Sequence, residues 1–420
     1  MAQLDSLSLG TAGATDGDTV MTDVVMETSD EISTLLSSSI PAEVFLASLL
    51  ENEAQNAYRS VIEEISSLLF KRLYHEISQN FKHYLCISEL DTSNKINFFH
   101  FVVLPLKQKV SSMQLVDLLG IAIEKAEPLQ AVSYLNHLNN DFEKLEDARL
   151  IFMSIKAFHL TRLMKYKEST ALLEEVKTLM DKARELDAAV NSAYHNAFAK
   201  LYLAEEKFDD FLYHALLYIS FTPMGDIPEA ERRMKGLEMA KAALVAPRMY
   251  NFGELLQLPL ITGDLQQSEN RWILEVLSAF DDGSLTAYNA LLEKYHRELE
   301  AEGFSTHLVG MRRKITLLAL MDYAFHKPKR QRVLSFEEIA GHCCISIDEV
   351  ELLLIKAMSL QLVKGRIDQV NQNVRITWVK QRILDSSRLA LMRQRINTWV
   401  LSAKELLAHM EEMTPELLIS

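Results

Sequence analysis

The chain has 420 residues, of which 48% are hydrophobic, and it carries a formal net charge of −14. This length accommodates two or more domains with substantial cores, and the small numbers of glycine and proline favour helices. The acidic balance disfavours nucleic acid and other polyanions as general partners.

The first 40 residues have the composition of a disordered acidic tail. Asp and Glu lie among Ser, Thr and Gly, and no Lys or Arg occurs before Arg59, contrary to secretory and transit peptides. Elsewhere, charged residues interrupt every apolar stretch well before about 18 residues, so we predict no membrane span. We expect a soluble protein of the cytoplasm and nucleus with a tail at residues 1–40.

Residues 41–248 have the pattern of a helical-repeat solenoid. Three segments recur at intervals of roughly 40 residues, and each resembles the start of the second helix of an antiparallel pair. These segments are 128–135, 165–173 and 207–217. Their aromatic residues are most simply core residues wedged between helices, namely Tyr134, Tyr166 and Phe208.

Two polar segments after the solenoid have both a functional and a structural interpretation. Asp281 and Asp282 resemble part of a metal site, yet Gly283 followed by Ser284 predicts a helix stop and the next N-cap. The basic segment Lys327–Arg332 is compatible with a nuclear-import signal. For this segment we favour a solvated loop after a helix.

Two Ser-x-x-Glu capping boxes predict a short helix that begins after Ser335 and a longer helix that begins after Ser346, in a segment typical of a winged helix. The second helix carries Asp348 and Glu349 where a DNA-reading helix presents Lys or Arg. Its apolar residues in Val350–Ile355 cover so much of the circumference that we expect burial on several sides. The charge and the apolar surface together predict protein binding.

A polar turn and two predicted strands complete the winged helix, which we place at residues 311–382. In the second strand, apolar Val374, Ile376 and Trp378 alternate with polar residues, as in a half-buried strand. All three are candidate protein-interaction residues. The shared face favours a core position for Trp378, while the alternation leaves a contact with a partner open.

The three cysteines are too few for a disulfide framework and indicate a reducing compartment. Cys343 and Cys344 follow His342, but neighbouring side chains in such a run cannot all face one ion. We expect buried cysteines at a helix end, and we predict no metal or cofactor.

Residues 383–420 form a predicted terminal helix with a heptad seam. The apolar positions are spaced 3, 4, 3, 4, 3, 4 over three repeats, a pattern that packs against a partner helix. The seam consists of Leu389, Met392, Ile396, Trp399, Ala403, Leu406 and Met410. Packing against a partner and folding back on the chain's own solenoid are equal alternatives. The strongest candidates for protein contact are Ile396, Trp399, Leu406 and Met410.

The order of solenoid, winged helix and terminal helix resembles the PCI family, found in the proteasome lid, the COP9 signalosome and the third eukaryotic initiation factor. Five segments are similar, in order, to one PCI subunit of the proteasome lid. They are 250–256, 272–280, 334–340, 350–358 and 362–368. The resemblance is strongest over 249–384 and does not reach the tail.

The resemblance implies a mainly α fold, with a right-handed solenoid of antiparallel helix pairs, a PCI module at residues 249–382 and a long C-terminal bundle helix. It also implies a non-catalytic scaffold whose partners are other PCI subunits and their C-terminal helices. In such assemblies the hairpin lies beside the next winged helix, so the backbone of Val374–Val379 is a candidate edge for strand pairing.

Sequence motifs for catalysis are missing. The 12 histidines include no His-x-His pair for the zinc of a lid deubiquitinase, and the phosphate-loop, dinucleotide and nucleophile-elbow motifs are absent. We therefore expect no enzyme activity and no small-molecule substrate. The alternatives are a PCI subunit of the signalosome or initiation factor, and a nucleic-acid adaptor that uses Lys364, Arg366, Arg375 and Lys380 of the wing.

Overall fold

The computed structural model describes residues 42–51, 59–87, 90–142, 146–183, 186–266, 270–327, 332–380 and 386–413. The acidic tail and most of the basic segment 327–332 lie outside the described residues, so both predictions remain untested. The chain divides into two compact units. Among the described residues, the first unit comprises those up to Glu206 together with His214–Thr222, and the second comprises Lys207–Tyr213 together with those from Pro223 onward.

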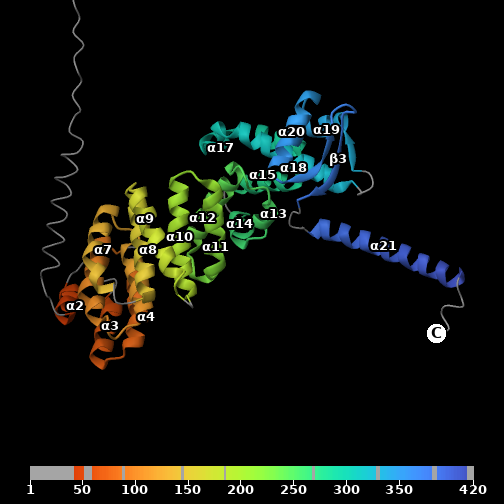
Figure 1. The fold of residues 1–420 in the computed structure, drawn as a ribbon. Helices are drawn as coiled ribbons and strands as arrows, with labels where there is room; N and C mark the ends of the chain where they lie inside the picture. Colours follow the sequence, from red (N-terminus) through yellow and green to blue (C-terminus); the bar gives the residue numbers. More distant parts are fainter. Residues whose placement is uncertain are drawn as a thin grey trace, which may run out of the picture. The chain divides into compact units, whose positions relative to one another are not determined.

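Helices build the first unit (Figure 1). Its main helices are α2 (Ala42–Glu51), α3 (Arg59–Lys71), α4 (Tyr74–Leu85), α5 (Thr92–Phe98), α6 (Ser112–Ile123), α7 (Pro128–Phe142), α8 (Glu146–Arg162), α9 (Tyr166–Met180), α10 (Ala188–Ala204) and the second half of α11 (Phe208–Phe221). Between α5 and α6 lie a π-helical turn, Phe99–Val103, and a 3-10 turn, Leu104–Leu106. Helix α8 packs against α6, α7, α9 and α10. The apolar faces of α2 to α10 form one continuous core, because each helix buries its apolar face against its neighbours.

The predicted repeats are confirmed, since α7, α9 and α11 begin within one residue of the starts of the three repeated segments. Tyr134 is buried in the core, whereas Tyr166 and Phe208 are half-buried. A buried hydroxyl pair also joins α8 to α9. Thr161 Oγ1 lies 2.9 Å from Ser169 Oγ, and the Ser169 hydroxyl donates to the carbonyl of Ala157.

The second unit continues with helices. They are α12 (Glu229–Val245), α13 (Phe252–Leu256), α14 (Pro259–Gln266), α15 (Arg271–Asp282), α16 (Leu285–Lys294), α17 (His296–Ala301) and α18 (Leu308–His326). The predicted helix stop is confirmed, because Gly283 adopts the left-handed conformation with φ of 68°. Ser284 then caps α16 by accepting a hydrogen bond from the backbone N–H of Ala287.

A small winged helix follows α18. It consists of β1 (Val333–Ser335), α19 (Phe336–Cys343), α20 (Ile347–Ser359), β2 (Val363–Asp368) and β3 (Asn373–Val379). The strands form an antiparallel sheet in the order β1-β3-β2. The core contains Leu334, Ile339, Val350, Leu354 and Val374, which are buried. Helix α21 (Ser386–Met413) then ends the described chain.

The predicted fold class is confirmed: helical repeats precede a winged helix and a long terminal helix. Strand β1 was not predicted, because only three residues pair and they lead directly into the N-cap of α19. No described helix combines the length and the apolar character needed to cross a membrane.

Candidate protein-interaction surfaces

The heptad seam of α21 is exposed along its length. The large apolar side chains of the seam are between 41% and 72% exposed, and Trp399 is the most exposed of them. The seam is wider than predicted at its C-terminal half, where Val400 and Leu407 are exposed beside it. Each of these two residues directly follows a seam residue, so they occupy the same flanking position in successive heptads. Their spacing was visible in the sequence, but the predicted seam did not include them. The exposed seam is available to another helix, and packing against a partner and packing against the chain's own solenoid both stay predictions.

Both capping boxes of the winged helix start helices, but only the second is complete. The Ser346 side chain accepts from the backbone of Glu349, whose carboxylate accepts from the Ser346 N–H at 3.3 Å. In α19, Ser335 Oγ accepts from the Glu338 N–H at 3.2 Å. The Glu338 carboxylate instead accepts from the hydroxyl of Tyr323 at 3.2 Å, which ties α19 to α18.

The expectation that α20 is buried on several sides is wrong. Its buried side chains, Val350, Leu354 and Ala357, line one face, where α20 packs against α19 and β2. A second apolar set is exposed, comprising Ile347 (43%), Leu352 (69%) and Ile355 (50%). Helical periodicity identifies both sets but cannot tell which one the fold covers. The exposed set lies beside Asp348 and Glu349, so the free surface of α20 is both acidic and apolar.

Trp378 does not share the core face of Val374 and Ile376. The register between β2 and β3 shifts at Lys364, which pairs with Trp378, while Gly365 pairs with Ile376. This β-bulge leaves Thr377 as an extra residue and turns Trp378 outward. Trp378 is 39% exposed, whereas Val374 and Ile376 are buried, so the favoured core position for Trp378 is wrong. Of these three candidate contact residues, only Trp378 has an exposed side chain.

The prediction of an open backbone edge at Val374–Val379 is also wrong. Strand β3 is the central strand, with β1 on one side and β2 on the other, and the Ile376 N–H donates to the carbonyl of Arg332 at 2.9 Å. The sheet edges are therefore β1 and β2. The prediction failed because the missed strand β1 occupies one side of β3.

The two adjacent cysteines occupy different environments. Cys343 is buried, as expected, and burial raises the pKa of its thiol to about 12. Cys344 is exposed, contrary to the expectation, because it caps the C-terminus of α19 in the left-handed conformation with φ of 50°. Among the described residues, no group of three or more His, Cys, Asp or Glu side chains is placed to hold a metal ion.

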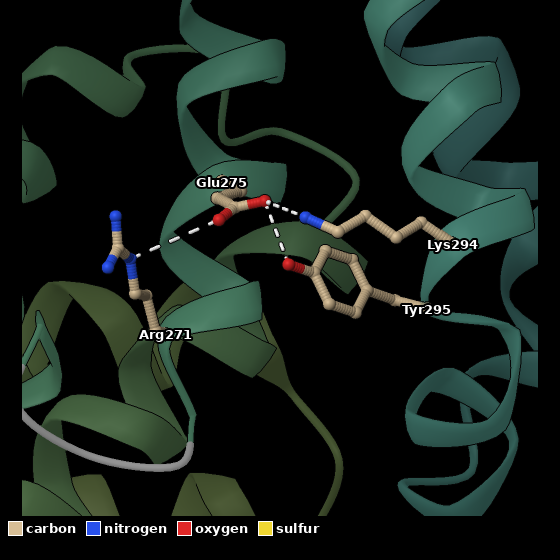
Figure 2. Close-up of polar contacts among 4 residues, drawn as sticks. All are labelled: Arg271, Glu275, Lys294 and Tyr295. Atoms are coloured by element: carbon tan, nitrogen blue, oxygen red, sulfur yellow. Dashed lines mark hydrogen bonds and ion pairs between the residues drawn. The ribbon is translucent and has the colours of Figure 1, made fainter.

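A polar cluster on α15 and α16 was not predicted (Figure 2). Glu275 Oε2 accepts from the hydroxyl of Tyr295 at 2.9 Å and from Lys294 Nζ at 3.1 Å, and Arg271 Nε lies 4.0 Å from its other oxygen. The hydrogen bond from Tyr295 is the main reason that the pKa of Glu275 lies below its usual range. All the partners of this carboxylate lie on α15 or at the end of α16, so the cluster braces two helices.

A buried lysine on α18 was likewise missed. Lys314 Nζ donates to the carbonyls of Ala243 at 2.5 Å and Ala246 at 2.7 Å, and it lies 4.9 Å from the ring centroid of Phe252. Burial lowers the pKa of Lys314 to about 7. A single lysine in an apolar helix has no sequence signal that separates it from a solvated one.

Comparison with known proteins identifies the family. The family described as PSD13 N-terminal repeats matches residues 61–277, and the PCI domain family matches residues 292–378. The 26S proteasome non-ATPase regulatory subunit 13 homolog A of Arabidopsis thaliana is 26% identical over 84% of this chain and 93% of its own length. The probable 26S proteasome regulatory subunit rpn9 of Schizosaccharomyces pombe is 31% identical over 68% of this chain and 74% of its own length.

The chain belongs to the 26S proteasome regulatory subunit 13 family.

This membership separates the alternatives within the PCI class. Eukaryotic translation initiation factor 3 subunit M of Drosophila sechellia is 28% identical, but over only 40% of this chain and 41% of its own length. The two family matches together span α3 to β3 and end before α21. The exposed seam therefore lies outside both family matches, and its proposed role rests on its own geometry.

Proposed function

We propose that the protein is a non-catalytic scaffold subunit of the proteasome lid, which supports ubiquitin-dependent protein degradation by assembling with other PCI subunits. The observation that carries this proposal is the match of the PSD13 N-terminal repeats to half of the chain. The relatives that match most of the chain are named as non-ATPase or regulatory subunits of the proteasome.

Two surfaces support an assembly role. The seam of α21 exposes more apolar surface than a free helix in water favours, so it gains stability when a partner helix covers it. The winged helix adds the exposed apolar row of α20 and the outward-facing Trp378. Large aromatic and apolar side chains of this kind contribute most of the binding energy of protein interfaces.

A nucleic-acid adaptor is the weaker alternative. In a winged helix that reads DNA, the N-terminus of the helix corresponding to α20 approaches phosphates. Here that end carries Asp348 and Glu349, which repel them. Affinity for duplex DNA that falls steeply with rising salt would support the adaptor.

Affinity purification tests the lid assignment. We expect the tagged protein, purified at low salt, to retain proteasome lid subunits that mass spectrometry identifies. Co-purification of signalosome or initiation-factor subunits in their place would contradict the assignment.

Substitutions in the seam test whether this surface holds the subunit in the complex. Trp399→Asp with Leu406→Asp should sharply reduce incorporation into the complex, because a buried unpaired charge costs several kcal/mol. Leu401→Asp with Ala408→Asp places the same charges on another face of α21 and should incorporate normally. Circular dichroism would check that both variants remain folded. Normal incorporation of the seam variant would overturn the role of the seam.

A further inference from the structure

The outer face of the β2–β3 hairpin carries an unfavourable pair of charges. Arg366 on β2 and Arg375 on β3 lie directly opposite each other in the register, and both are exposed. Side chains of directly opposed residues point to the same face of a sheet, and like charges there destabilise the pairing of the strands. Exposed Lys364 and Lys380 add two more positive charges to the hairpin.

The nearest acidic residue of the hairpin does not neutralise this pair. The Asp368 carboxylate accepts from the backbone N–H of Asn371 at 3.1 Å and from its side-chain amide at 2.8 Å, so it is used within the turn. Within the described part of the chain, no carboxylate forms an ion pair with Arg366 or Arg375. The two guanidinium groups therefore have free donors that face outward.

An exposed tryptophan borders the arginine pair. The bulge at Thr377 turns Trp378 outward, and Lys364 Nζ lies 5.2 Å from its ring centroid. The Thr377 hydroxyl donates to the carbonyl of Lys364 at 3.0 Å, which links the two strands at this point. The face thus combines two guanidinium groups, which bind carboxylates well, with an aromatic ring that offers apolar contact.

We propose that this basic hairpin face, formed by Lys364, Arg366, Arg375 and Trp378, binds an acidic segment of another protein chain. Carboxylates of the segment lie between Arg366 and Arg375, and an apolar side chain covers Trp378. This proposal rests on the proposed function, because another subunit of the complex would supply the acidic segment. Charge complementarity alone also admits nucleic acid, but the acidic N-terminus of α20 belongs to the same module and opposes a duplex.

A peptide-binding experiment on the full-length protein tests the proposal. The probe is a short fluorescein-labelled Glu-Ser repeat peptide, followed by fluorescence anisotropy, with a Gln-Ser repeat peptide as the neutral control. We expect the acidic peptide to bind, and Arg366→Gln with Arg375→Gln to weaken it by roughly tenfold or more. Lys167→Gln with Lys182→Gln makes the same change in net charge on exposed positions of the first unit and should leave the affinity unchanged.

Three outcomes would overturn the proposal. The first is equal affinity of the wild type and the arginine double variant. The second is tighter binding of duplex DNA than of the acidic peptide, lost in the same variant, which would assign the face to nucleic acid. The third is peptide binding that occurs only after deletion of residues 1–38, which would assign the face to this chain's own acidic tail.

The free protein offers an independent readout. If the arginine pair has no acidic partner in the isolated chain, Arg375→Gln should raise its melting temperature by about 1–3 °C. A lower melting temperature would show that the pair is already neutralised and would contradict the proposal. If affinity purification fails to recover lid subunits while the peptide still binds, the result contradicts the proposed function and leaves the hairpin proposal standing. If lid subunits are recovered but the peptide does not bind, the result contradicts the hairpin proposal alone.

Discussion

Lys314 satisfies the end of α12 in a way that the local backbone cannot. The carbonyl of Ala243 would normally accept from the N–H four residues later, but that residue is Pro247, which has none. The Lys314 side chain supplies the missing donor and a second one to Ala246. A buried lysine therefore joins α18 to α12 in the second unit.

Replacement of this lysine should destabilise the protein and change its pH dependence. Lys314→Met should lower the free energy of unfolding by about 1–3 kcal/mol for each carbonyl left without a donor. The folded state lowers the pKa of Lys314 to about 7 from 10.5, so between these values the unfolded chain binds more protons. The stability contributed by Lys314 therefore rises with pH across this window.

Denaturant titrations at pH 6 and pH 9 measure this effect. The difference between the wild type and Lys314→Met should be larger at pH 9, when a neutral amine still donates to both carbonyls. Lys167→Met, at an exposed position of α9, should show little difference at either pH. A wild-type advantage that does not change with pH would contradict the assigned pKa.

At the scale of elements, the β-bulge decides which side chains the hairpin presents. Gly365 pairs with Ile376, next to the extra residue Thr377, and a Cβ atom on Gly365 would come within 2.5 Å of the carbonyl oxygen of Arg375. Only glycine allows the two strands to approach so closely at this point. The outward position of Trp378 thus depends on Gly365 of the neighbouring strand, because glycine has no side chain.

Gly365→Ala should disrupt the hairpin. We expect a loss of about 1–3 kcal/mol of stability, since the strands must separate to accommodate the methyl group. Gly310→Ala is the control, because Gly310 is exposed near the start of α18 and an added methyl group would have no atom within 4 Å. This control should be neutral or slightly stabilising, as expected for alanine in a helix. Equal stability of the two variants, measured by urea denaturation, would refute the close approach.

The same elements show how far sequence patterns determine the candidate surfaces. Capping boxes and apolar periodicity located α19, α20 and α21, because these signals are local. The outward position of Trp378 depends on a one-residue register shift, and the exposed row of α20 depends on which face the sheet and α19 cover. Both features depend on tertiary packing. Strict alternation along a strand and helical periodicity describe only the local chain, so they placed these side chains in the core wrongly.

At the scale of the molecule, the described apolar cores begin only after the acidic tail. Leu46 is the first buried hydrophobic residue of the described chain, and it belongs to the large cluster that runs through the first unit. The continuity of this cluster explains why the repeats could be predicted from sequence, since each repeat must bury the face of its neighbour. The pairing of Arg366 with Arg375 could not be predicted in this way, because it depends on the register between β2 and β3.

Deletion of residues 1–38 should leave the fold intact. This deletion removes no member of the described core, so the melting temperature should change by no more than about 2–3 °C. Differential scanning calorimetry of the full-length and truncated proteins makes the comparison. A larger decrease would mean that the tail packs on the folded chain.

If a partner helix covers the seam of α21, as proposed, the seam also links the abundance of this protein to that of its partners. A free copy displays a row of apolar side chains that includes Trp399 and Leu406, and such rows promote aggregation and attract chaperones and proteases. Binding of a partner covers the seam and, by mass action, lowers the concentration of free copies. Excess subunits made without partners would therefore be short-lived, and the helix that joins the complex would also mark an orphan for disposal.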